Sequence, residues 1–107
     1  MHDDYKVLYL DAVEADIAGA RQWYAEQQEG LDARFAAAVK ETLENIMKMP
    51  LSYAARHNNV RIAHTKNFPY NVHFYVDKGK RRVVIIGVVH GKRNDALFLD
   101  RPHSRLK

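Results

Sequence analysis

Residues 60–91 read VRIAHTKNFPYNVHFYVDKGKRRVVIIGVVHG, and this stretch decides the fold. Apolar and polar side chains alternate over residues 60–65 and over residues 71–77, which predicts two half-buried strands. Residues 77–80 read Asp-Lys-Gly-Lys and form a turn, and the run 83–89 is almost wholly apolar, as expected of a central strand covered on both faces. Because short connections join the three strands, we expect them to pair antiparallel.

Two amphipathic helices precede these strands. The first is expected to run to about residue 28, with Asp11 at the N-cap position and Glu14 completing a capping box. The second begins near Leu31 and ends before Pro50, which cannot continue a helix. The apolar stripes consist of Val13, Ile17, Ala20 and Tyr24 in the first helix and of Leu31, Phe35, Ala38, Val39, Thr42, Leu43 and Ile46 in the second.

One further strand, over residues 5–10, leads into the first helix. The predicted order is therefore β-α-α-β-β-β, which is an α+β fold. A helical hairpin packs on one face of a mostly antiparallel sheet, because each apolar stripe needs a surface that covers it. We find no repeat or linker, and we expect a single domain over residues 1–107.

The composition excludes several classes of site. There is no cysteine, so disulfides, thiolate zinc sites and cysteine nucleophiles are ruled out, and a reducing cytoplasm is the expected location. The histidines lack paired metal-ligand spacing, so we expect neither a metal nor another cofactor. The sequence contains no secretion signal and no apolar stretch of the roughly 18 residues that a membrane span needs, so no membrane association is expected.

Charge is distributed unevenly along the chain. The formal net charge is +4 and the isoelectric point is about 9.4. Acidic residues concentrate before Asn45, and basic residues dominate the second half. Such a surface attracts an anionic partner, either a nucleic acid or an acidic protein segment, and the sequence does not choose between them.

Antiparallel pairing gathers several of these basic residues at one edge of the sheet, where residue 65, residue 71 and residue 89 should meet. Arg61 lies four residues before this edge, roughly 14 Å along an extended strand. Arginine and lysine stabilise charge on phosphate oxygens, and a histidine can move a proton, so the edge suits a phosphodiester. The residues predicted there are Lys66, Tyr70, His90, Lys92 and Arg93.

A plain structural interpretation competes with this one. Basic residues at strand ends are most often solvated, and a single histidine after a buried strand is most often a structural hydrogen-bonding group. We also predict that Trp23, Tyr24 and Phe35 pack in the core or between the helices.

The sequence resembles the RelE/ParE toxin superfamily, and most of all its ParE-like or plasmid-stabilisation branch. The similarity depends on the order and spacing of short motifs across nearly the whole chain. These motifs are Ala15-Asp16-Ile17, Trp23-Tyr24, Gly30-Leu31 with Phe35, Pro50, Val60-Arg61, Phe68-Pro69-Tyr70 leading into Val72, Phe74 and Val76, and Val88-Val89-His90-Gly91-Lys92-Arg93.

The resemblance implies the fold predicted above and a role as the toxin of a type II toxin-antitoxin system. It also implies a cognate antitoxin that wraps the toxin in a hetero-oligomer. Members similar to RelE are ribosome-dependent mRNA endoribonucleases that use basic and aromatic groups on the sheet, so Arg61, His90 and Arg93 would be catalytic, and Lys66, Tyr70 and Lys92 would bind substrate or partner.

Members similar to ParE instead inhibit DNA gyrase and have no recognised hydrolytic site. The Trp23-Tyr24 helix and the Phe68-Pro69-Tyr70 connection look closer to that branch. The first hairpin strand also lacks a lysine-rich cluster, since only Lys66 follows it. We therefore place gyrase inhibition ahead of mRNA cleavage, and a third alternative is a non-toxic member that acts only as a binding protein.

Overall fold

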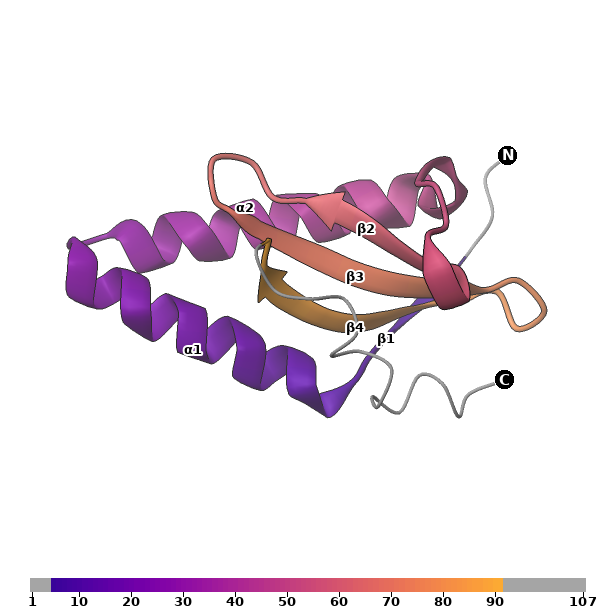
Figure 1. Ribbon diagram of the computed structural model, residues 1–107, viewed down its shortest axis with the longest axis horizontal. Helices are drawn as coiled ribbons and strands as arrows, with labels where there is room; N and C mark the ends of the chain where they lie inside the picture. The colour runs from indigo at the N-terminus through magenta and orange to yellow at the C-terminus, as the bar shows by residue number, and fades with distance from the viewer. Residues whose placement is uncertain (1–4, 92–107) are drawn as a thin grey trace.

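The computed structural model describes residues 5–91, apart from the side chain of His57. Its sheet has the strand order β1-β4-β3-β2 and its two helices are joined by a short connection (Figure 1). The strands are β1 (Lys6–Tyr9), β2 (Val60–His64), β3 (Tyr70–Asp77) and β4 (Arg82–His90), and the helices are α1 (Asp11–Gln27) and α2 (Leu31–Lys48). The predicted α+β fold and its element order are confirmed.

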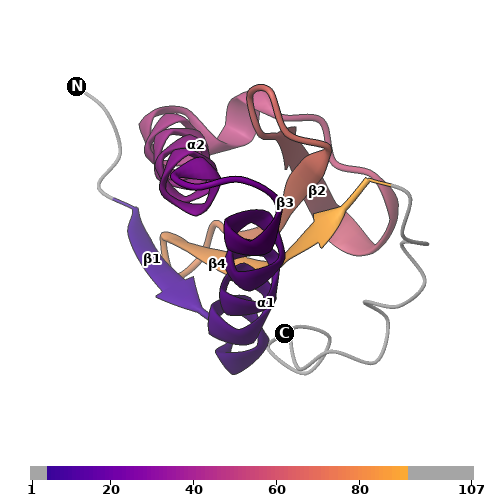
Figure 2. The ribbon, with the colours of Figure 1, turned by 90° about the vertical axis from the view of Figure 1, so that its left-hand side faces the viewer.

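The sheet is mixed, because β1 pairs with β4 in parallel whereas the other neighbours are antiparallel. Figure 2 shows β1 at the edge of the sheet, beside β4. Strand β4 lies inside the sheet, between β1 and β3, and every residue of Val83–Val89 is buried, as the apolar run predicts. A β-bulge opposite His73 and Phe74 shifts the register within the β3–β4 pair.

The start of α1 differs from the prediction. Asp11 is the first helical residue rather than the N-cap, and no side-chain hydrogen bond caps the helix among the described residues. The reason lies in the sheet: the backbone N–H of Leu10 donates to the carbonyl of Ile85 at 3.1 Å, so the chain stays extended through Leu10. The Asp11 carboxylate in the first turn still stabilises the helix, because it lies at the positive end of the helix dipole.

The main core lies between the helical hairpin and one face of the sheet. Phe35 and Ile46 of α2 are fully buried, as are Val72 and Phe74 of β3. Val13, Ala20 and Tyr24 of α1 complete this layer, so both predicted stripes face the sheet. The arrangement fixes α1 against the end of β4, which positions the site described next.

Candidate site between the first helix and the sheet edge

Tyr70 and His90 come together at the sheet edge, where the sequence predicts them. They are register partners at the start of β3 and the end of β4, and their rings lie edge to face with centroids 5.4 Å apart. The preceding turn is tight, because Asn67 adopts a left-handed conformation with φ of 68°. The Thr65 backbone N–H donates to the Tyr70 carbonyl at 3.0 Å, which closes this turn.

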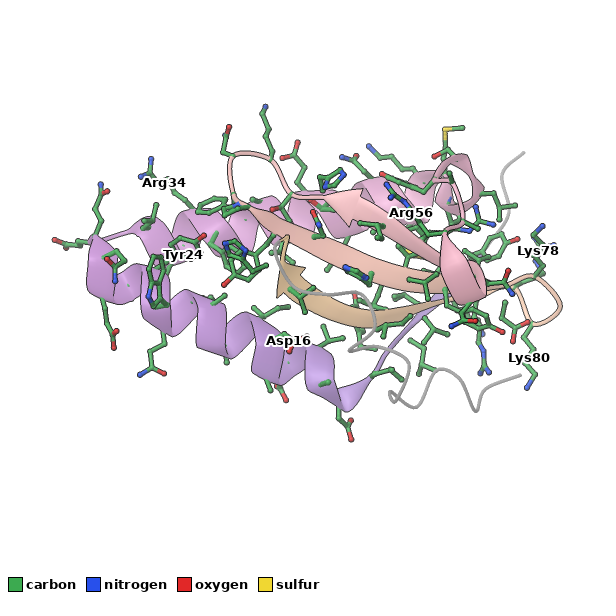
Figure 3. The ribbon with its side chains drawn as sticks, in the orientation of Figure 1. Asp16, Tyr24, Arg34, Arg56, Lys78 and Lys80 are labelled. Carbon is green, nitrogen blue, oxygen red and sulfur yellow. The ribbon has the colours of Figure 1, made fainter. Side chains whose placement is uncertain are left out.

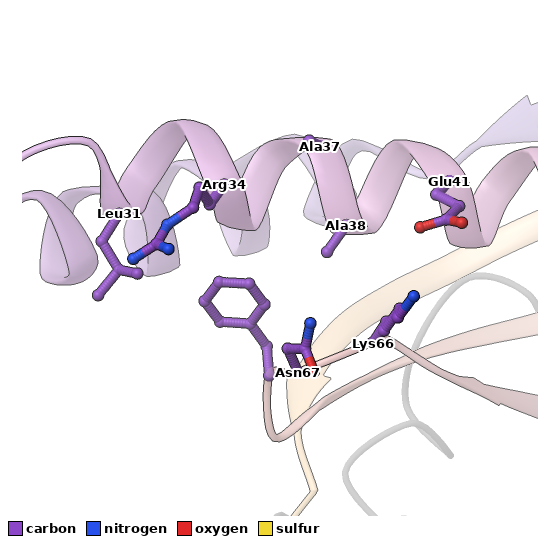
Figure 4. Close-up of a pocket in the computed structure, with 8 residues that line it drawn as sticks. Leu31, Arg34, Ala37, Ala38, Glu41, Lys66 and Asn67 are labelled. Atoms are coloured by element: carbon purple, nitrogen blue, oxygen red, sulfur yellow. The ribbon is translucent and has the colours of Figure 1, made fainter.

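Lys66 lies in the same turn but borders a different cavity. That cavity, of about 570 Å³, lies between α2 and the turn. Figure 4 shows Arg34 and Glu41 on α2, across from Lys66 and Asn67. The residues that line it include neither Tyr70 nor His90, so the single cationic cleft predicted from the sequence is divided between two cavities.

Arg61 is engaged inside the fold. It pairs with Phe74 and therefore shares the face of β2 and β3 that the core covers. Its Nη1 donates to the carbonyl oxygen of Tyr53, whose ring packs against Phe74 with centroids 5.5 Å apart. The guanidinium thus ties the connection after α2 to strand β2.

Arg61 and His90 do not converge. The register places Arg61 opposite Phe74 and His90 opposite Tyr70, and these two residues of β3 are four positions, or roughly 14 Å, apart. Lys92 and Arg93 lie outside the described residues.

A second cavity, of about 470 Å³, opens beside Tyr70 and His90 and is bordered on its other side by α1. Asp16 points from α1 toward β4, and Tyr24 points toward the sheet and α2 (Figure 3). The Asp16 carboxylate accepts a hydrogen bond of 3.0 Å from the backbone N–H of Val88, which fixes α1 on β4. The lining residues are Ala15, Asp16, Gly19, Ala20, Trp23, Tyr24, Pro69, Tyr70, Val88, Val89 and His90.

Tyr24 is the centre of an aromatic cluster behind this cavity. Its ring centroid lies 5.2 Å from that of Phe35, 5.0 Å from that of Phe68 and 6.1 Å from that of Tyr70. Burial raises the pKa of the Tyr24 hydroxyl above its ordinary value, and the nearby Tyr70 raises it further. Tyr24 is therefore a neutral phenol at neutral pH, suited to packing and hydrogen bonding.

The prediction for Trp23 is wrong. Tyr24 and Phe35 are buried, as predicted, but 55% of the Trp23 surface is exposed. The spacing of these residues indicates the exposed position of Trp23. The buried stripe includes Ala20 and Tyr24, whereas Trp23 follows Ala15 and Gly19 at intervals of four on another, exposed face of the helix. The indole packs edge to face on Tyr24, with centroids 5.1 Å apart.

The cavity combines an exposed indole, two phenols, an imidazole and a carboxylate, a set suited to recognising a partner's side chains. Within residues 5–91, no three side chains of metal-ligating type gather closely enough to hold an ion. Neither described helix is long and apolar enough to cross a membrane.

Solved structures similar to this chain come from bacterial toxin-antitoxin systems. The chromosomal ParDE system of P. aeruginosa aligns with a TM-score of 0.68 and 14% identity, covering 80% of this chain and 95% of the other. The toxin-antitoxin complex RelBE2 of Mycobacterium tuberculosis gives 0.57 and 21%, covering 80% and 96%. The isolated E. coli RelE toxin gives 0.54 and 11%, covering 97% and 100%. At these identities the likeness shows the fold.

The family comes from the sequence itself. A comparison with curated proteins gives no match. A family model described as "ParE toxin of type II toxin-antitoxin system, parDE" matches residues 7–95, which is most of the chain and extends from within β1 to beyond β4. The chain therefore belongs to the ParE toxin family of type II toxin-antitoxin systems.

Proposed function

We propose that this toxin arrests growth by binding DNA gyrase, and that it does so without hydrolysing a substrate. The observation that carries the proposal is the separation of Arg61 from His90. A nuclease site needs its cations and its proton-transfer group around one phosphate. Arg61 instead donates to the Tyr53 carbonyl, and Lys66 borders another cavity. A cognate antitoxin follows from the family.

The surface around His90 favours a protein partner. Its most exposed large group is the Trp23 indole, and tryptophan is enriched among the residues that dominate protein–protein binding. Tyr70 and His90 line the same cavity as the indole and can contact the same partner. Their rings pack edge to face on each other, which holds both in position.

The test uses purified toxin in two assays run in parallel. In the first, gyrase supercoils relaxed plasmid in the presence of increasing toxin, with and without the cognate antitoxin. In the second, the same toxin is added to ribosomes translating a defined mRNA. We expect supercoiling to fall and antitoxin to restore it, with the mRNA left intact.

Cleavage of the mRNA with normal supercoiling would establish the endoribonuclease alternative. In that case Lys92 and Arg93, which follow His90 in the sequence, would be the next residues to substitute. Absence of both effects, together with antitoxin binding, would identify a binding protein without toxicity.

A further inference from the structure

We propose that the cavity beside α1 receives an arginine side chain from a basic segment of the toxin's target, with its guanidinium over the Trp23 indole. The inference rests on the proposed function only in assigning the occupant to the target. It adds the chemistry of the contact, which the family does not specify. Three independent features lead to it.

The first feature is an exposed aromatic side chain in a fixed position. Trp23 packs on Tyr24, and Tyr24 is 7% exposed and held by Phe35 and Phe68. An indole supported in this way loses little conformational freedom when a partner covers it. Arginine is the cation that most often stacks on tryptophan, because its guanidinium is planar and weakly hydrated.

The second feature is room for a side chain next to that indole. The cavity measures about 470 Å³ and extends from Trp23 to His90. Gly19 borders it, and a Cβ placed on Gly19 would meet no atom within 4 Å. Glycine inside a helix is less favourable than alanine, and packing within the described fold does not require it. It does allow a foreign chain to approach the helix backbone closely.

The third feature is the charge of α1, which is opposite in sign to that of the whole chain. The net charge is +4, yet α1 carries four carboxylates and a single arginine. That arginine, Arg21, pairs with Asp32 of α2 at 3.6 Å. The carboxylates are Asp11, Glu14, Asp16 and Glu26, and Asp16 lines the cavity itself.

This charge favours a basic protein segment over a nucleic acid, whose phosphates the carboxylates repel. Asp16 places a carboxylate on the wall of the cavity, and the N–H of Val88 holds that carboxylate in position.

The experiment uses the fluorescence of Trp23, which is the only tryptophan of the chain. The full-length toxin is titrated with a capped nonapeptide of alternating leucine and arginine residues flanked by glycine and serine. Two matched peptides carry citrulline, a neutral isostere of arginine, or glutamate in place of arginine. We expect a saturable change in emission with the arginine peptide, about tenfold weaker binding with citrulline and no binding with glutamate.

Paired variants separate the cavity from general electrostatics. Glu26→Lys on α1 should weaken binding several-fold, whereas Glu44→Lys on α2 makes the same change in net charge and should have little effect. Gly19→Leu should fill the cavity and abolish binding, and Gly19→Ala should retain most of it. Both Gly19 variants favour helix formation, and circular dichroism verifies that they fold.

Equal affinity for the arginine and citrulline peptides would overturn the proposal, as would an emission change produced only by a single-stranded oligonucleotide. The Gly19→Leu toxin is also tested on gyrase. If it still inhibits supercoiling, this inference fails and gyrase inhibition stands. If the arginine peptide binds as described but the unmodified toxin leaves gyrase active, gyrase is not the target and the cavity's preference for arginine stands.

Discussion

Replacing Arg61 by alanine separates a structural role from a catalytic one. The Arg61 guanidinium donates to the Tyr53 carbonyl, and the backbone N–H of Arg56 donates to the Val60 carbonyl at 2.7 Å in the same connection. A hydrogen bond from a charged group contributes about 1.5–3 kcal/mol. We take about 2 kcal/mol as the loss, which is a substantial part of the roughly 5–15 kcal/mol that stabilises a domain.

The assay is urea unfolding followed by circular dichroism. With a slope of about 2 kcal/mol per molar urea, the midpoint of Arg61→Ala should fall by about 1 M. Arg56→Ala is the matched control, because this exposed side chain should contribute no more than about 0.5 kcal/mol. Growth inhibition by Arg61→Ala should persist at temperatures where the variant is folded. An unchanged midpoint combined with complete loss of toxicity would refute this reasoning and place Arg61 at the target.

Three further substitutions test the packing around the site. The raised pKa of Tyr24 favours the protonated phenol in the fold, so the contribution of Tyr24 to stability is fully present below about pH 10 and is lost as pH rises through the folded-state pKa. Tyr24→Phe should therefore lose less stability than the unmodified chain between about pH 8 and about pH 11 in urea unfolding, and identical losses would contradict this. Gly19→Ala should raise the melting temperature by about 4 °C in calorimetry, whereas a decrease would mean that the fold needs glycine there. Phe35→Ala removes a fully buried ring and should cost about 3–5 kcal/mol in urea unfolding; a loss below about 1 kcal/mol would show that the cluster collapses without strain.

Local patterns were enough to predict the elements and the layers of the fold. The apolar run 83–89 identified the central strand, and the stripes on the helices identified the faces that meet the sheet. The partner of β1 was not predictable in this way. Its parallel pairing with β4 joins segments separated by the whole helical hairpin, and no local spacing records that contact. The same long-range contact extends the chain through Leu10 and removes the predicted capping box.

The site was predictable only in part, for similar reasons. The sequence alone predicted that Tyr70 and His90 lie at the same edge of the sheet, because antiparallel pairing places the start of β3 beside the end of β4. The position of Lys66 depends on how α2 packs beside the turn, and the engagement of Arg61 depends on where Tyr53 lies. Trp23 was grouped with Tyr24 and Phe35 as an aromatic residue at helical spacing, although its spacing to Ala15 and Gly19 places it on the exposed face of the helix.

Pulse labelling in cells tests the central claim most directly. The toxin is induced in a bacterium that lacks its antitoxin, and the incorporation of labelled thymidine and labelled leucine is followed over the first minutes. Inhibition of gyrase predicts that DNA synthesis falls first, that protein synthesis follows later, and that antitoxin co-expression prevents both effects. An immediate fall in protein synthesis while DNA synthesis continues would contradict the account and identify the toxin as an mRNA endoribonuclease.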